Sequence, residues 1–176
     1  MKKLFALVLA LCLLCGVALA EDSGNTITWD DIQPILEASG LSGDFVVFDQ
    51  LGLKIWLPAG LVATEVSAED AAAGRLALYM AEDQSSYFVV DAVHVDGMTL
   101  DQAIENAKAT AKSVDAINTN GLSAVSYINE ASDTMCVSLV DTNSNIINFA
   151  VGPYSADPEN TETVFSFIMA SLQPAE

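Results

Sequence analysis

His94 and Cys136 are the residues of this chain whose types are used in nucleophilic catalysis. His94 is the only histidine, and Cys136 is the only cysteine after the first twenty residues, so together they match a cysteine nucleophile and its base. Both lie in apolar runs that predict strands. A histidine at the end of an apolar row is usually structural, and a buried free cysteine is usually an inert packing residue with a raised pKa. We therefore predict no catalytic residue.

Oxygen side chains at alternate positions of Asp141-Thr142-Asn143-Ser144-Asn145 match the start of a calcium loop. Ile146 occupies the position of the required glycine, and Gly152 stands where a bidentate glutamate closes such a site. The segment therefore predicts an ordinary turn between strands, and we expect no metal site. Weak calcium binding by adjacent carboxylates stays an alternative, and the pairs are Asp30-Asp31, Glu69-Asp70 and Glu82-Asp83.

Other catalytic and cofactor motifs are missing from the sequence. Gly121-Leu122-Ser123-Ala124-Val125 lacks the second glycine of a serine-hydrolase elbow, and no glycine-rich loop precedes a predicted helix. We predict no cofactor and no enzymatic activity, with an extracellular hydrolase that uses an unrecognised site as the alternative.

The charge of the chain is strongly acidic and limits its partners. Six basic residues stand against 24 acidic ones, which gives a formal net charge of −18. Affinity for nucleic acids and anionic lipids comes mainly from lysine and arginine, so we predict binding to neither. The acidic surface favours solubility and would attract cations or a basic partner.

Residues 1–20 predict a cleaved signal peptide. Lys2 and Lys3 precede an apolar segment over residues 4–14, and Ala18-Leu19-Ala20 is a small-x-small cleavage site before an acidic stretch. Cys12 and Cys15 each follow a leucine rather than the small residue typical of a lipidated cysteine, which disfavours a lipoprotein. We expect a secreted or extracytoplasmic protein without stable membrane insertion after cleavage.

The remaining chain is long enough for one domain with a real core. Residues 21–42 predict a polar leader and a short helix that begins near Asp31, because Pro34 suits a first turn, and that ends at Gly40. Residues 43–176 predict the main domain. Cys136 alone allows no internal disulfide, so packing must stabilise the fold.

The main domain shows strand patterns on both sides of a long helix. Short β-rich runs at 44–49 and 53–58 predict a hairpin, and a capped turn at 67–74 follows. The capping box Thr99-Leu100-Asp101-Gln102 opens a helix that we expect to continue to Val114. The last helix opens at Asp157-Pro158 and buries Val164, Phe165, Ile168 and Leu172. The other predicted strands are 75–81, 86–95, 124–129, 134–141 and 146–152.

This order of elements predicts an α+β fold: a single antiparallel sheet of about six to seven strands packed with helices in an α/β/α sandwich. It resembles the PsbP-like fold of photosystem extrinsic proteins, a Ran-binding nuclear group and exported bacterial domains of unknown role. The resemblance rests on Leu53 to Gly60, Asp96 to Leu100 and Val164 to Leu172, and it spans most of residues 43–172. It implies an exported domain that binds or assembles rather than catalyses.

The combined expectation is a non-enzymatic domain that binds an extracytoplasmic protein or an envelope component. Exposed aromatic residues are the candidate contact points for such a partner. Trp56 and Tyr154 are flanked by polar positions and loops, so we predict that they form the partner-binding surface. Trp29 and Tyr87 are the alternatives.

Overall fold

The computed structural model describes residues 28–175, and the predicted signal peptide, 1–20, lies outside them together with 21–27 of the leader. The helices are α2 (Trp29–Ser39), α3 (Ala68–Ala72), α4 (Leu100–Thr110) and α5 (Pro158–Ala170). The first strands are β1 (Gly43–Phe48), β2 (Leu53–Pro58), β3 (Leu61–Thr64), β4 (Arg75–Ala81) and β5 (Tyr87–His94). The later strands are β6 (Lys112–Thr119), β7 (Leu122–Asn129), β8 (Thr134–Val140), β9 (Asn145–Gly152) and β10 (Gln173–Pro174).

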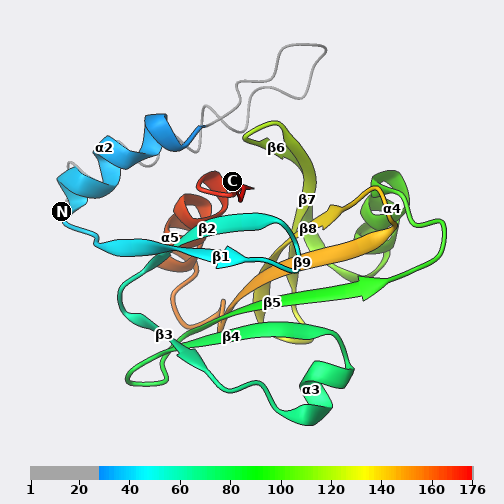
Figure 1. Cartoon of the computed structure of the whole chain (residues 1–176), viewed down its shortest axis with the longest axis horizontal. Coiled ribbons are helices and arrows are strands. Elements are labelled where there is room, and N and C mark those ends of the chain that lie inside the picture. Colours follow the sequence, from blue (N-terminus) through cyan, green and yellow to red (C-terminus); the bar gives the residue numbers. More distant parts are fainter. Residues whose placement is uncertain (1–27, 176) are drawn as a thin grey trace.

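A seven-stranded antiparallel sheet in the order β3-β4-β5-β9-β8-β7-β6 forms the centre of the molecule (Figure 1). Its inner face, which carries the main core, holds alternate side chains such as Phe88, Val90 and Phe149, all fully buried. The Phe88 and Phe149 rings stack with their centroids 6.4 Å apart. We call the opposite side of this sheet its outer face.

A second, three-stranded sheet in the order β1-β2-β10 and the helix α5 cover the inner face. From β2, Ile55 and Leu57 join the core, and from α5 Phe165 and Ile168 do the same. Helix α5 contacts β2, β8 and β9, and α2 packs against α5 (Figure 1). This layer seals the core between the two sheets.

Buried hydrogen bonds fix the C-terminal end of α5. Ser171 Oγ accepts a hydrogen bond from the Trp56 backbone N–H at 2.7 Å and donates one to the carbonyl of Ile168 at 2.6 Å. In the β6–β7 turn, Thr119 donates to the carbonyl of Met169, and the Asn120 amide donates to two further carbonyls beyond it. The final carbonyls of the helix, which lack partners within it, are thereby satisfied.

Helices α3 and α4 flank the outer face. Helix α4 contacts β6, β7 and β8, whereas α3 contacts β4, so β5 and β9 lie between the two helices. Gly74 joins α3 to β4 with φ of +102°, and a Cβ there would lie 2.6 Å from the carbonyl oxygen of Ala92. Only glycine fits this connection without a backbone shift, so it fixes the position of α3 beside the sheet.

The α+β, PsbP-like fold predicted from the sequence is confirmed, with four corrections in detail. The hairpin of β1 and β2 belongs to its own small sheet. Helix α2 begins at Trp29, because Thr28 and Asp31 form a capping box, and Pro34 lies inside it. Helix α4 ends at Thr110, and the chain from Lys112, Val114 included, forms β6 instead. Strands β3, β6 and β10 were not predicted.

Candidate functional site

Four polar residues form a row across the outer face, one on each of four neighbouring strands. Arg75 of β4 pairs with Asp91 of β5, Asp91 with Asn148 of β9, and Asn148 with Ser138 of β8. Residues directly opposite one another in a sheet share a face, so these four side chains, which we call the polar row, point the same way. Each is polar within a mostly apolar strand.

Tyr127 of β7 extends the polar row at the α4 side. Its hydroxyl lies 3.1 Å from Ser138 Oγ and donates to Asn148 Oδ1 at 3.3 Å, and Ser138 Oγ donates to the same oxygen at 2.9 Å. Burial, together with the nearby Cys136, raises the pKa of Tyr127, so the phenol stays neutral at physiological pH. The row therefore ends in an uncharged network of hydroxyl and amide groups.

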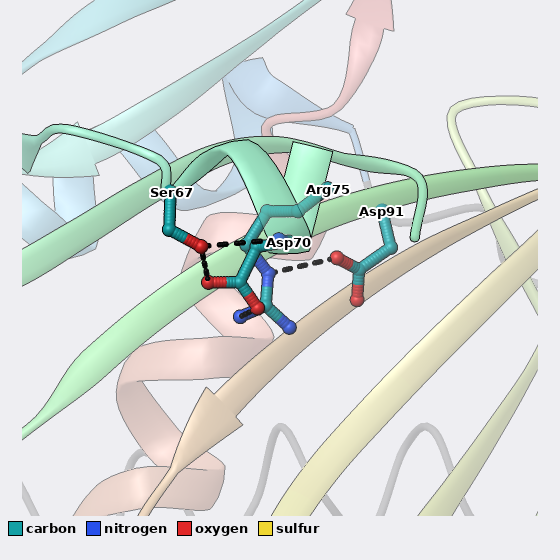
Figure 2. Close-up of polar contacts among 4 residues, drawn as sticks. All are labelled: Ser67, Asp70, Arg75 and Asp91. Atoms are coloured by element: carbon teal, nitrogen blue, oxygen red, sulfur yellow. Dashed lines mark hydrogen bonds and ion pairs between the residues drawn. The ribbon is translucent and has the colours of Figure 1, made fainter. Parts of the chain in front are cut away.

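The opposite end of the polar row is charged and attaches α3 to the sheet (Figure 2). Arg75 Nε donates to Asp91 Oδ1 at 2.9 Å, and a second guanidinium nitrogen lies 3.5 Å from Asp70 of α3. Ser67 caps α3 and donates to Asp70 Oδ2 at 2.6 Å. Because Arg75 is bonded on both sides, its role at this end of the row is structural.

A pocket of about 340 Å³ opens between α4 and the outer face. Its walls are the sheet-facing side of α4, the chain that leaves it, and side chains of β7, β8 and β9. Tyr127 and Ser138 line it, so the pocket adjoins the uncharged end of the polar row. Its lining is Ala103, Asn106, Ala107, Ala109, Thr110, Ala111, Val125, Tyr127, Asn129, Ser138 and Ile146.

The structure separates His94 from Cys136. His94 pairs with Asn145 on β9 and Cys136 with Ala150, five residues apart, which is about 17 Å along a strand. The two side chains also lie on opposite faces of the sheet. Burial raises the pKa of the Cys136 thiol, which favours its unreactive protonated form. A nucleophile and base pair between them is therefore excluded.

His94 is exposed rather than buried at the end of the apolar row. Its Nε2 lies 2.9 Å from Asp96 and its Nδ1 lies 3.2 Å from Asn145 Oδ1. The hydrogen bond with Asp96, followed by that with Asn145, raises the pKa of the imidazole. His94 thus holds the loop after β5 against the start of β9.

The candidate calcium loop is the turn between β8 and β9, as predicted. Asp141 Oδ1 accepts the backbone N–H groups of Asn143 and Asn145, and its Oδ2 accepts the Asn145 amide. Burial alone would raise the pKa of Asp141, but these hydrogen bonds outweigh it and lower the pKa. The carboxylate is occupied by the turn, and within residues 28–175 no three acidic, histidine or cysteine side chains are grouped as metal ligands.

Of the two predicted contact residues, Trp56 lies in the core. It is only 5% exposed, so its expected position on the surface is wrong. The reason is that α2 packs over this side of β2, with the ring of Trp29 6.2 Å from that of Trp56. Tyr154 is half-buried, and its hydroxyl donates to Glu162 at 2.6 Å.

The basic side chains of the described residues are all engaged locally. Besides Arg75, Lys108 pairs with Glu105, Lys112 with Glu130, and the Lys54 ammonium lies 5.8 Å from the centre of the Phe45 ring. Most carboxylates therefore have no basic partner in this part of the chain.

None of the helices in residues 28–175 is long and apolar enough to span a bilayer.

The sequence contains a signal for the polar row. Ser138 interrupts an apolar run in β8, and Asn148 interrupts another in β9. A polar residue at the centre of an otherwise apolar strand needs a partner, because an unsatisfied buried polar group is costly. The sequence alone does not reveal the register of β8 and β9 that places Ser138 opposite Asn148.

The chain has a PsbP-like α+β fold. The cyanobacterial PsbP (CyanoP) of Synechocystis sp. PCC 6803 is similar to it, with 11% identity, coverage of 89% of this chain and 98% of that one, and a TM-score of 0.56. The Ran-binding protein Mog1p of Saccharomyces cerevisiae shares 12% identity over 77% of this chain and 97% of its own, with a TM-score of 0.42. No family model and no curated protein matches the sequence.

Proposed function

We propose that this protein is an exported, non-enzymatic domain that binds an extracytoplasmic protein or envelope component through the outer face of its large sheet. The observation that carries this proposal is the polar row, which crosses the strip of β5 and β9 between α3 and α4. Next to the row, Val93 is 45% exposed although it lies in an interior strand. Apolar contact beside hydrogen-bonding groups is the usual composition of a protein interface.

The arrangement of the row favours binding over catalysis. Its hydroxyl and amide groups bond to one another and its carboxylate bonds to Arg75, and within residues 28–175 neither His94 nor another base is bonded to Ser138. A serine nucleophile needs such a base within hydrogen-bond distance. The row offers polar groups held in fixed positions, which gives a binding surface its specificity.

The charge of the surface supports a basic partner. With 24 acidic residues against six basic ones, the protein attracts positively charged surfaces over a distance set by the ionic strength. The sequence of residues 1–20 supports export and cleavage after Ala20. We infer that the partner is met outside the cytoplasm.

A pull-down with a matched pair of variants tests the proposal. Val93→Arg places a charge on the outer face, whereas Val47→Arg makes the same change on β1 of the small sheet, where Val47 is 51% exposed. Secreted and envelope proteins are passed over the immobilised wild type and both variants, and retained proteins are identified by mass spectrometry. We expect a stoichiometric partner to be lost with Val93→Arg and kept with Val47→Arg.

The opposite pattern, a partner kept by Val93→Arg and lost with Val47→Arg, would move the binding surface to the small sheet. Unchanged circular dichroism spectra of both variants are the control for folding. A variant of Tyr154, Tyr154→Ala, tests the remaining predicted contact residue in the same experiment. Loss of the partner with this variant alone would place the interface at the start of α5.

A further inference from the structure

Among residues 28–175, those that line the pocket beside α4 are all uncharged, although the chain carries a net charge of −18. A charged ligand would lose its hydration there without gaining an opposite charge. An entirely apolar ligand would cover hydroxyl and amide groups of the walls and leave them without water. The lining therefore selects an uncharged ligand that has hydrogen-bonding groups.

The pocket exists because the sheet-facing side of α4 is built from small residues. Ala103 and Ala107 are one helical turn apart and face Val125 and Ile146 of the sheet. Alanine side chains are too short to fill this space, so the hollow remains. Its volume, about 340 Å³, is at the lower end of the range for small-molecule sites and fits one small ring compound.

The polar groups of the walls offer both donors and acceptors. Asn129 Oδ1 accepts two backbone N–H groups of its own turn, which leaves its NH₂ group as a donor. The Thr110 hydroxyl donates to the carbonyl of Asn106, which leaves its oxygen as an acceptor. Tyr127, whose hydroxyl belongs to the network of the polar row, also lines the pocket.

A ligand hydroxyl both donates and accepts, so a compound with several hydroxyls matches these walls better than one with donors or acceptors alone. The CH groups of such a compound can pack on the alanine, valine and isoleucine side chains. We propose that the pocket beside α4 binds a single uncharged sugar ring. This small-molecule site goes beyond the proposed partner surface, and it can be tested without any partner.

Titrations followed by NMR can test this site directly, with four probes that share one ring shape. Glucose and N-acetylglucosamine are neutral, glucuronate is an anion, and glucosamine is a cation. We expect saturable shifts of the backbone amide signals of Ala107, Tyr127 and Ser138 with one or both neutral sugars. We expect about tenfold weaker binding or none at these amides with both charged rings.

Two substitutions on α4 separate occupation of the pocket from binding elsewhere. Ala107→Leu fills the pocket, and Asn106→Leu narrows it from an exposed position that tolerates the change. Ala38→Leu makes the same kind of change on an exposed position of α2 as a control. We expect the sugar-dependent shifts to disappear in the folded pocket variants and to persist in Ala38→Leu.

Three results would overturn the proposal. One is the absence of shifts at the pocket amides with either neutral sugar at high millimolar concentration. Another is equal binding of neutral and charged rings, which would indicate non-selective contact. The third is unchanged sugar binding in Asn106→Leu and Ala107→Leu; if Ala107→Leu does not fold, Asn106→Leu alone decides.

Discussion

The hydroxyl of Tyr154 shows how a single neighbour sets the behaviour of a residue. Its hydrogen bond to Glu162, which only the protonated phenol can donate, raises the pKa of Tyr154 to about 12, with smaller contributions from burial and from the negative charge of Glu162. A raised folded-state pKa stabilises the fold below the unfolded pKa, which is about 10 for tyrosine. This contribution is lost as the pH rises from about 10 through about 12.

We predict that Glu162→Gln moves the titration of Tyr154 back toward the ordinary tyrosine value. The measurement is an NMR titration of the tyrosine ring signals, with Tyr154→Phe used to assign the signal. Gln keeps the size of the side chain but removes its charge, so this variant isolates the effect of the Glu162 charge on the pKa of Tyr154. An unchanged pKa of Tyr154 in Glu162→Gln would mean that another group raises it.

The local sequence around a residue predicts its burial only in part, as the two predicted contact residues show. Local polarity around Trp56 suggested exposure, yet the residue that buries it, Trp29, lies 27 positions earlier in the chain and on another element. Exposure depends on what packs over a strand, which the neighbours of a residue in sequence do not encode. The expected burial of Cys136 was confirmed, because an apolar strand at the centre of a sheet is covered on both sides.

At the scale of elements, the side chain of Ser171 extends the pairing between β10 and β2 beyond the last backbone pair. Strand β10 pairs Gln173 with Lys54, and the same register places Ser171 opposite Trp56. Ser171 caps the C-terminal end of α5 and is not part of a strand. Its side-chain hydroxyl therefore takes the place of a strand carbonyl and accepts the Trp56 N–H. The helix and the small sheet are thus joined by one fully buried hydroxyl.

We predict that Ser171→Ala lowers the free energy of unfolding by about 1–3 kcal/mol, because it leaves a buried N–H without an acceptor. The matched control is Ser39→Ala. Ser39 makes the same bond to the carbonyl three residues earlier, that of Leu36, at the end of α2, but it is only half-buried and accepts no strand N–H. Urea denaturation of both variants measures the difference, and equal losses would contradict the role assigned to Ser171.

Elements with explicit boundary signals were predictable from the sequence. The capping box at Thr99, the Asp157-Pro158 start and the Gly40 stop are all found where local chemistry places them. Strand β6 was missed because no glycine or proline marks the end of α4, and Ala111 and Val114 continue its helical pattern past Thr110. The strand forms because Lys112 and, after a register shift, Asp115 to Thr119 pair with β7, which is a tertiary effect.

At the scale of the whole molecule, uncompensated negative charge opposes the compact state. Four described basic residues form ion pairs or cover an aromatic ring, and most carboxylates are left to repel one another. We predict that raising sodium chloride from low to near-molar concentration increases the melting temperature by a few degrees, because salt screens this repulsion. Calorimetry at neutral pH measures it.

A melting temperature that falls with added sodium chloride would show the reverse, that the few ion pairs stabilise the protein more than the excess charge destabilises it. Potassium chloride at the same ionic strength is the control for ion-specific effects.

The net charge was fully predictable from the sequence. The polar row was not, because it joins β4, β5, β9 and β8, whose register is set by the complete sheet.

The hydrogen bond between Trp56 and Ser171 joins residues 115 positions apart. A ribosome makes β2 long before α5 and β10, so the part of the small sheet that these two elements contact stays bare until residues 158–174 have been synthesised. Contacts between such distant segments make folding slow, since a long loop must close before they form. Completion of the core therefore waits for α5, and a nascent chain that stops before Pro158 would be left as a substrate for chaperones and proteases.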